Sequence, residues 1–163
     1  MCSSYGINNT IIYPDSDLEV YLIYNNKLCK TTSHWGIPLY DKLVIHARSE
    51  TLEEKKLFSG LTHCIIKSDS FIEWDESHYK VEFTRIDEEP LYMAGLIDLE
   101  NHNHVIITTS PNESVINIHD RMPLILEKNQ LKNWLTSYNS NNILLSRPKL
   151  LKVNRELEQL SLF

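Results

Sequence analysis

Thiols are scarce in this sequence, and their spacing excludes two classes of small protein. The 163 residues include only three cysteines, Cys2, Cys29 and Cys64, and no CxxC pair. An odd and scattered set argues against a disulfide framework and against a zinc site, and it is typical of proteins from a reducing cytoplasm. We therefore expect a cytoplasmic protein that uses no metal or other cofactor, in which Cys29 and Cys64 are small buried hydrophobic residues.

Long hydrophobic runs are also missing. No apolar segment is long enough to span a bilayer, and no charged-then-apolar leader begins the chain. With 42% hydrophobic and 23% charged residues, the composition is that of an ordinary soluble globular protein. A chain of 163 residues can bury a sizeable core on its own. We expect one compact, monomeric domain without a membrane partner.

Positive charge is limited as well. Lysine and arginine together number 16 against 22 aspartate and glutamate residues, which gives a net charge of −6. Proteins that hold duplex nucleic acid regardless of its sequence rely on many cations to neutralise phosphates. The composition disfavours that function, so a nucleic-acid partner would have to be held by a few well-placed arginines.

Short runs of β-branched and aromatic residues dominate the chain and predict strands. Asn25 and Asn26 follow the first clear run and predict a hairpin turn. Three segments have helical character, and Ser49 is the expected N-cap of the first. The predicted strands are residues 18–24, 27–30, 42–46, 62–66, 70–74, 79–85, 91–99, 105–109 and 123–126. The predicted helices are residues 49–58, 111–116 and 129–138.

This order of elements predicts an α+β fold, in which a mixed or antiparallel sheet curls into a partial barrel with a few short helices. The chain contains no internal repeat and no low-complexity segment. From about Lys149 the pattern changes to a charged stretch that ends in apolar residues. We therefore divide the chain into a domain, residues 1–150, and a tail, residues 151–163.

Cys2 has a chemistry that no internal cysteine can have. If Met1 is removed, Cys2 carries a free α-amine and a thiol on adjacent carbons. The amine has an ordinary pKa of roughly 7.7–8.0, so a usable fraction is nucleophilic near pH 7, and the thiol is easily activated by its surroundings. An aldehyde that meets this pair can form a Schiff base, which the sulfur closes into a thiazolidine ring. A small buried terminal residue is the alternative interpretation.

Several other segments carry motifs whose order and spacing form a pattern together with the terminal MCSSYG. They are WGIP at 35–38, IHARSET at 45–51, SFIEW at 70–74, AGLI at 94–97, IITTSPNES at 106–114 and IHDRMPLIL at 118–126. This pattern resembles the SRAP family, the SOS-response-associated peptidase domain proteins that process abasic sites in single-stranded DNA. The resemblance covers nearly the whole domain, from Met1 to about Leu150.

The resemblance implies a set of roles. In that family the mature terminal cysteine forms a thiazolidine with the aldehyde of a ring-opened abasic site, and the covalent link shields the lesion. Carried over, Cys2 is the nucleophile, and Glu73 and His119 are the acid–base pair. Arg48 and Arg121 are the implied phosphate contacts, and abasic single-stranded DNA is the implied partner.

The residue types suit these roles. Glu73 precedes Trp74, and a carboxyl group beside an indole can be desolvated, which raises its pKa toward neutrality. His119 can take up and return a proton near physiological pH. Trp35 can offer a face on which a base stacks. The alternatives are an exposed strand-end glutamate, a structural histidine and a core tryptophan.

Some residues depart from the family pattern. His46 occupies the position where the family usually has asparagine, which orients the nucleophile; histidine can do this too, but it is larger and can ionise. Ser3 and Ser4 replace the usual Gly-Arg, which removes one positive contact. The NHNH stretch contains His102 and His104 without a third ligand, and we expect an exposed turn there. We expect altered pH dependence and weaker DNA binding.

The last five residues resemble the QLSLF-type peptide that docks on the bacterial sliding clamp. Leucine and phenylalanine would fill apolar pockets while glutamine bonds at the rim; the alternative is that these residues fold back on the domain. The expected contacts are Gln159, Leu160, Leu162 and Phe163.

Three functions follow as hypotheses. The first is a DNA-repair protein that crosslinks itself to abasic sites, with lyase-like or self-release activity. The second is a thiol peptidase or autoprotease that uses Cys2, Glu73 and His119. The third is a non-catalytic module that binds the clamp or DNA.

Overall fold

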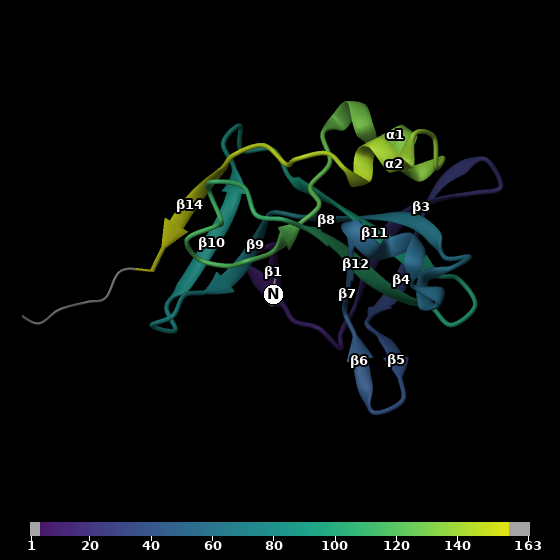
Figure 1. Cartoon of the computed structure of the whole chain (residues 1–163), viewed down its shortest axis with the longest axis horizontal. Helices are drawn as coiled ribbons and strands as arrows, with labels where there is room; N and C mark the ends of the chain where they lie inside the picture. The colour runs from purple at the N-terminus through teal and green to yellow at the C-terminus, as the bar shows by residue number, and fades with distance from the viewer. Residues whose placement is uncertain (1–3, 157–163) are drawn as a thin grey trace, which may run out of the picture.

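The computed structural model describes residues 4–156, and it contains two main sheets that lie side by side (Figure 1). The first sheet has five strands in the order β14-β10-β9-β1-β2, and all its neighbours are antiparallel. Its strands are β1 (Ser4–Ile7), β2 (Thr10–Ile12), β9 (Ser70–Trp74), β10 (Lys80–Arg85) and β14 (Leu151–Arg155). The expected mixture of sheet and short helices is confirmed.

The second sheet has seven strands and closes on itself. Strand β11 pairs with both β8 and β12, so that β11, β8, β3, β4 and β12 form a ring. The pairs of β12 with β4 and with β7 are parallel, and the others are antiparallel. The expected curling of a mixed sheet is thereby confirmed. The strands are β3 (Asp17–Tyr24), β4 (Lys27–Trp35), β7 (His46–Arg48), β8 (Thr62–Ser68), β11 (Leu91–Asp98), β12 (Asn103–Thr109) and β13 (Met122–Pro123).

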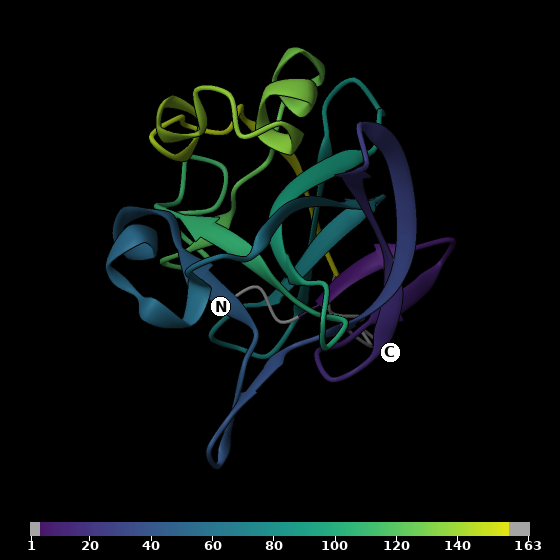
Figure 2. The same ribbon diagram turned by 90° about the vertical axis from the view of Figure 1, so that its right-hand side faces the viewer.

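The alternation of side chains along the ring strands separates two cores. Ile66 belongs to the cluster that the ring shares with the five-stranded sheet, whereas Ile65 points to the other face. That face is covered by α1 (Lys128–Leu135) and α2 (Ser140–Leu144). Trp134 of α1 is fully buried there, and its indole N–H donates to the carbonyl of Cys64 at 2.9 Å. In both views the helices and the hairpin of β5 (Ile37–Leu39) and β6 (Lys42–Val44) lie at opposite ends of the molecule (Figures 1 and 2).

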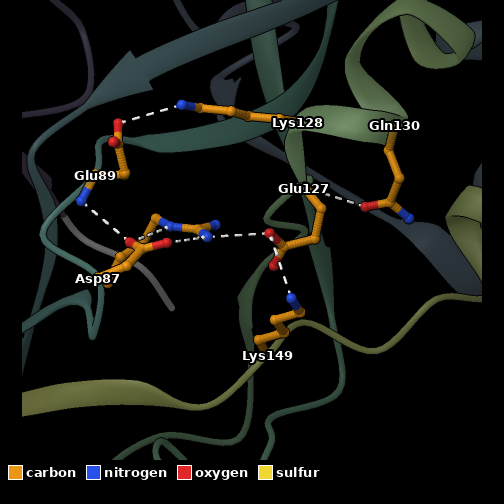
Figure 3. A network of polar contacts seen from close by, with 7 residues as sticks. Asp87, Glu89, Glu127, Lys128, Gln130 and Lys149 are labelled. Atoms are coloured by element: carbon orange, nitrogen blue, oxygen red, sulfur yellow. Dashed lines mark hydrogen bonds and ion pairs between the residues drawn. The ribbon is translucent and has the colours of Figure 1, made fainter.

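Local chemistry explains the turns and ends that were predicted correctly. Asn25 and Asn26 both have positive φ, 50° and 62°, which the tight turn between β3 and β4 requires and which asparagine tolerates. Helix α1 begins at Lys128 with a reciprocal capping box between Glu127 and Gln130. Glu127 also accepts a bond from Arg85, which in turn binds Asp87, so this network fastens the start of α1 to the end of β10 (Figure 3).

Two of the predicted helices do not form. Residues 49–58 are two 3₁₀ segments, Ser49–Glu54 and Lys56–Phe58, separated by the extended residue Lys55. Ser49 is the first helical residue and makes no cap; Arg48 occupies the N-cap position. Residues 111–116 form no helix. The side chain of Asn112 accepts from the backbone N–H of Ser114 and donates to the carbonyl of Pro148, and a turn begins at Glu113.

Two predicted strands were placed wrongly. Residues 42–46 are divided between β6 and β7. Of the last predicted strand, residues 123–126, only Pro123 lies in a strand, β13. Helix α2 was not predicted.

The predicted tail begins as part of the folded domain. Leu151–Arg155 is strand β14 at the edge of the five-stranded sheet, where it pairs with β10. The prediction that residues 151–155 lie outside the domain is therefore wrong. Across residues 4–156 we find no helix that is both long and apolar enough to cross a membrane.

Candidate active site

Glu73 is a buried carboxyl group in the five-stranded sheet. It lies on the same face of β9 as Phe71, the face that packs into the core, and only 2% of its surface is exposed. Within residues 4–156, its Oε1 atom has no hydrogen-bond partner. Burial raises the pKa of Glu73 to about 8, and the negative charge of Asp120 contributes in the same direction. The predicted desolvation is confirmed, and the group is a proton donor at neutral pH.

The pairing of β1 and β9 directs the start of the described chain toward Glu73. Ser4, the first described residue, lies opposite Ile72, which directly precedes Glu73. Strand β10 flanks β9 on the other side, with Val81 opposite Glu73. Cys2, the predicted nucleophile, lies outside the described residues.

His46 is connected to β1 through aromatic rings. Tyr5 of β1 and Trp35 of β4 have ring centroids 4.7 Å apart, and Trp35 and His46 are 6.1 Å apart. His46 lies on β7, parallel to β12 and opposite Ile106. Both ring nitrogens of His46 are shielded from solvent. Tyr5, Trp35 and His46 thus form a wall of aromatic rings between the ring of strands and β1, the first described strand.

Trp35 is part of this wall and cannot stack on a base. It is fully buried, and its indole N–H donates to the carbonyl of Ile45 at 3.0 Å. The prediction of a DNA-stacking face is wrong, and the alternative of a core tryptophan is confirmed. Its bond to Ile45 holds the residue next to His46.

His119 and its two neighbours form the third part of the site. The backbone N–H of Arg121 donates to Nδ1 of His119 at 3.1 Å. An Oδ1 atom of Asp120 lies 3.1 Å from the same nitrogen. Asp120 also acts electrostatically on Glu73, which connects His119 to the carboxyl group of β9. Asp120 thus links Glu73 and His119, whose acid and base roles stay predictions, and the sequence did not single Asp120 out.

Arg121 has a structural role. Its guanidinium makes two 2.8 Å bonds to the carboxylate of Glu50 and further bonds to Thr108, and the side chain is only 9% exposed. These donors are bound within the domain, and the role of Arg121 as a phosphate contact stays a prediction. Glu50 is 71 residues away in the sequence, and no local pattern indicated the pair. The pair fixes the backbone that faces His119.

Arg48 remains available at the surface. Its side chain is 63% exposed, and its nearest carboxylate, Glu50, is 4.0 Å away. The role of Arg48 as a phosphate contact stays a prediction. Gln159, Leu160, Leu162 and Phe163, the predicted clamp contacts, lie outside the described residues.

The remaining histidines and cysteines differ from expectation in part. Cys64 is fully buried as predicted, and burial raises its thiol pKa, but Cys29 is only half-buried. His104 is fully buried inside the ring, not exposed in a turn, and its Nδ1 lies 2.9 Å from Ser33 Oγ. Burial lowers the pKa of His104 to about 3, so its ring is neutral. The sequence had no signal for the burial, because His104 begins the inward-facing row of β12.

Comparison with known proteins places this chain in a family. A family model described as "SOS response associated peptidase (SRAP)" matches residues 12–160. The abasic site processing protein YoqW of Bacillus subtilis is 37% identical over 138 residues, which cover 72% of this chain and 61% of YoqW. The abasic site processing protein YedK of Escherichia coli is 27% identical over 104 residues, which cover 56% of this chain and 47% of YedK.

The fold is similar to that of solved structures. A crystal structure of a protein from Bordetella bronchiseptica has a TM-score of 0.78 and 21% identity, and the match covers 96% of this chain and 100% of that one. The curated relatives are longer proteins, since the match to YoqW spans about three fifths of its length. The extent of the family match and the identity to YoqW establish that this chain belongs to the SOS response associated peptidase (SRAP) family.

Proposed function

We propose that the chain captures abasic sites in single-stranded DNA through a covalent bond to Cys2. The observation that carries this proposal is the buried carboxyl of Glu73, whose pKa is raised to about 8, at the end of β9 toward which β1 directs the chain. Cys2 is two residues from Ser4, a separation that an extended chain covers in about 7 Å. The similarity to proteins named abasic site processing proteins supports the same substrate.

The chemistry requires a proton donor and returns one water molecule. The amine of the terminal cysteine adds to the aldehyde of the ring-opened sugar and gives a carbinolamine. Glu73 in its protonated form donates a proton to the leaving hydroxyl, and water departs as the imine forms. The thiol adds across the imine: the new C–S bond closes the ring, and the thiol proton ends on the ring nitrogen. His119 accepts and returns the protons that move between these steps.

The experiment that tests this proposal uses single-stranded DNA with one abasic site. We expect a protein–DNA adduct that survives denaturing electrophoresis. Cys2→Ala should abolish it, because the ring cannot close, and Cys2→Ser should give a much weaker product. Cys29→Ala is the matched control, since this half-buried thiol lies in the β3–β4 hairpin and should have no effect.

Other results would point to a different function. Equal crosslinking by wild type, Cys2→Ala and Cys2→Ser would refute the terminal-thiol mechanism. Peptide cleavage without a DNA adduct would favour a thiol peptidase, and strand scission at the lesion would show lyase activity. Intact mass is the first control, because a retained Met1 would block the amine.

We further propose that Gln159, Leu160, Leu162 and Phe163 bind the bacterial sliding clamp. The sequence supports this, because two apolar anchors follow a glutamine at the end of a charged stretch. Removal of residues 159–163 should eliminate clamp capture and leave crosslinking intact. Loss of crosslinking on this truncation would mean that the segment stabilises the domain instead.

A further inference from the structure

The Nδ1 atom of His119 lies near two groups that require opposite protonation states of this nitrogen. The backbone N–H of Arg121 can donate to Nδ1 only while that nitrogen carries no proton. The carboxylate of Asp120 can accept from the same Nδ1 only when it carries a proton. Both contacts measure 3.1 Å, so the bond that forms depends on the charge of the imidazole.

The donor of this pair is held in place, whereas the acceptor is not. Arg121 is anchored by the bonds of its guanidinium to Glu50 and Thr108, which fix the position of its backbone N–H. Asp120 has an 87% exposed side chain, and no other hydrogen bond to its carboxylate is present among residues 4–156. The free carboxylate is therefore the adjustable part of the contact.

Asp120 also acts on the second titrating group of the site. Burial is the largest cause of the raised pKa of Glu73, and the charge of Asp120 raises it further. On the neighbouring strand β10, Lys80 and Glu82 flank Val81, which pairs with Glu73, and therefore point to the opposite face of the sheet. The carboxylate of Asp120 thus contacts His119, and its charge also acts on Glu73.

We propose that Asp120 is a positioning residue that sets the charge states of His119 and Glu73 together. Its negative charge favours a protonated imidazole, whose Nδ1–H it accepts, and disfavours a second negative charge on Glu73. The site therefore holds two protons ready for transfer at a pH where isolated groups would have released at least one. This role rests on the proposed function, in which Glu73 donates a proton and His119 exchanges one.

The first test is a titration of both groups by NMR, with the carboxyl carbon of Glu73 and the ring protons of His119 as probes. In Asp120→Asn, both groups should titrate at lower pH than in wild type, by a few tenths of a pH unit, because the removed charge is exposed and well screened. The shift should shrink as salt is raised to about 1 M, where the Debye length is about 3 Å. A merely structural role of Asp120 would not produce this salt dependence.

The second test is the rate of adduct formation as a function of pH. Both limbs of the profile should move to lower pH in Asp120→Asn, because Glu73 loses its proton earlier and His119 becomes neutral earlier. Asp120→Glu should restore most of the wild-type profile. Asp41→Asn, at the exposed tip of the β5–β6 hairpin, is the matched control and should change nothing.

The outcomes separate this inference from the proposed function. Unchanged titration of Glu73 and His119 in Asp120→Asn would overturn the inference, even if wild type crosslinks DNA efficiently. Absence of any adduct from wild type would overturn the proposed function, while the titration would still decide whether Asp120 couples the two groups.

Discussion

Two regions of the molecule bury an ionisable side chain, and they do so in opposite ways. At the end of β10, Arg85 is only 15% exposed, and Asp87 and Glu127 both bind it within 3.0 Å (Figure 3). In β9, Glu73 is more deeply buried, yet no cation is paired with it among residues 4–156, and one of its oxygens has no hydrogen bond there. The first arrangement stabilises a folded connection, and the second keeps a carboxyl group protonated. Strongly perturbed ionisable groups cluster at functional sites, so this difference supports the proposed role of Glu73.

Replacement of Glu73 should give the largest effect. Glu73→Gln preserves shape but cannot donate a proton, so adduct formation should slow by about 10²-fold or more, as is typical for loss of a general acid. The rate of adduct formation under single-turnover conditions measures this. Glu76→Gln, an exposed glutamate in the next turn, is the control and should behave as wild type.

The same variant should be more stable than wild type at high pH. The folded pKa of Glu73, about 8, lies above its unfolded value of 4.5, so the unfolded state gains stability as pH rises between these values. Glu73→Gln removes this cost, which amounts to about 2–4 kcal/mol at pH 8 and vanishes near pH 4. Denaturant unfolding at the two pH values tests it; a destabilised variant at pH 8 would mean that Glu73 is paired after all.

Substitutions that break the ion pairs of Arg85 should change stability alone. Glu127→Ala removes a partner of Arg85 and the cap of α1, and we expect a loss of about 2 kcal/mol. Glu127→Gln retains the capping geometry and should lose about half of that. Urea unfolding measures both, and crosslinking by the folded fraction should be unchanged. A specific loss of crosslinking would contradict the division between the two regions.

His104 provides a third case, a buried group that remains neutral. Its folded pKa of about 3 lies below its unfolded value of 6.5, so stability is complete above pH 6.5 and falls as the pH drops toward 3. The loss between pH 7.5 and 5 should be about 2 kcal/mol. His104→Asn keeps a donor toward Ser33 without a titrating ring and should flatten this dependence; His102→Asn, at an exposed position, is the control.

His34 should have the opposite effect on the pH dependence of stability. Hydrogen bonds to Asp15 and Asp17 raise the pKa of His34, so its contribution is present below its unfolded value of 6.5 and is lost as pH rises through the raised folded value. The charge of His34 also contributes to the lowered pKa of His104, so the His104 experiment should be repeated in a His34→Gln background to separate the two contributions.

The smallest effect should come from the exposed arginine. Arg48→Gln should weaken binding to undamaged single-stranded DNA by roughly 3- to 10-fold and reduce the salt slope by about 0.7, the value for one phosphate contact. Fluorescence anisotropy over a salt series measures this, with Lys27→Gln in the distant β3–β4 hairpin as the control. An unchanged salt slope would remove Arg48 from the DNA interface.

The fold could be predicted where local pattern and tertiary contacts agree. The alternation of Val20 and Leu22 gave strand β3, and the paired asparagines gave the turn that follows it. The pattern failed where distant groups decide the outcome. Asn112 organises turns because it binds the carbonyls of Pro148 and Lys149, more than 30 residues away.

The same limit applies to the edge strand and the site. Strand β14 buries only Leu151, so its sequence resembles a solvated tail, and only the partner β10 makes it a strand. Glu73 was found through its family motif and its tryptophan neighbour. The pair of Arg121 with Glu50 was not predicted, because Glu50 lies in another motif and no local rule connects the two.

The position of β14 has a mechanical consequence. Arg155 is opposite Val81, and Val81 is opposite Glu73, so the end of the last described strand stands in one row with the buried carboxyl, two strand spacings or roughly 10 Å away. A partner bound to the chain beyond Arg155 would therefore be held close to Glu73, the proposed proton donor. Tension applied to the chain beyond Arg155 would first load the hydrogen bonds between β10 and β14. It would load β9, the strand of Glu73, only after these bonds break.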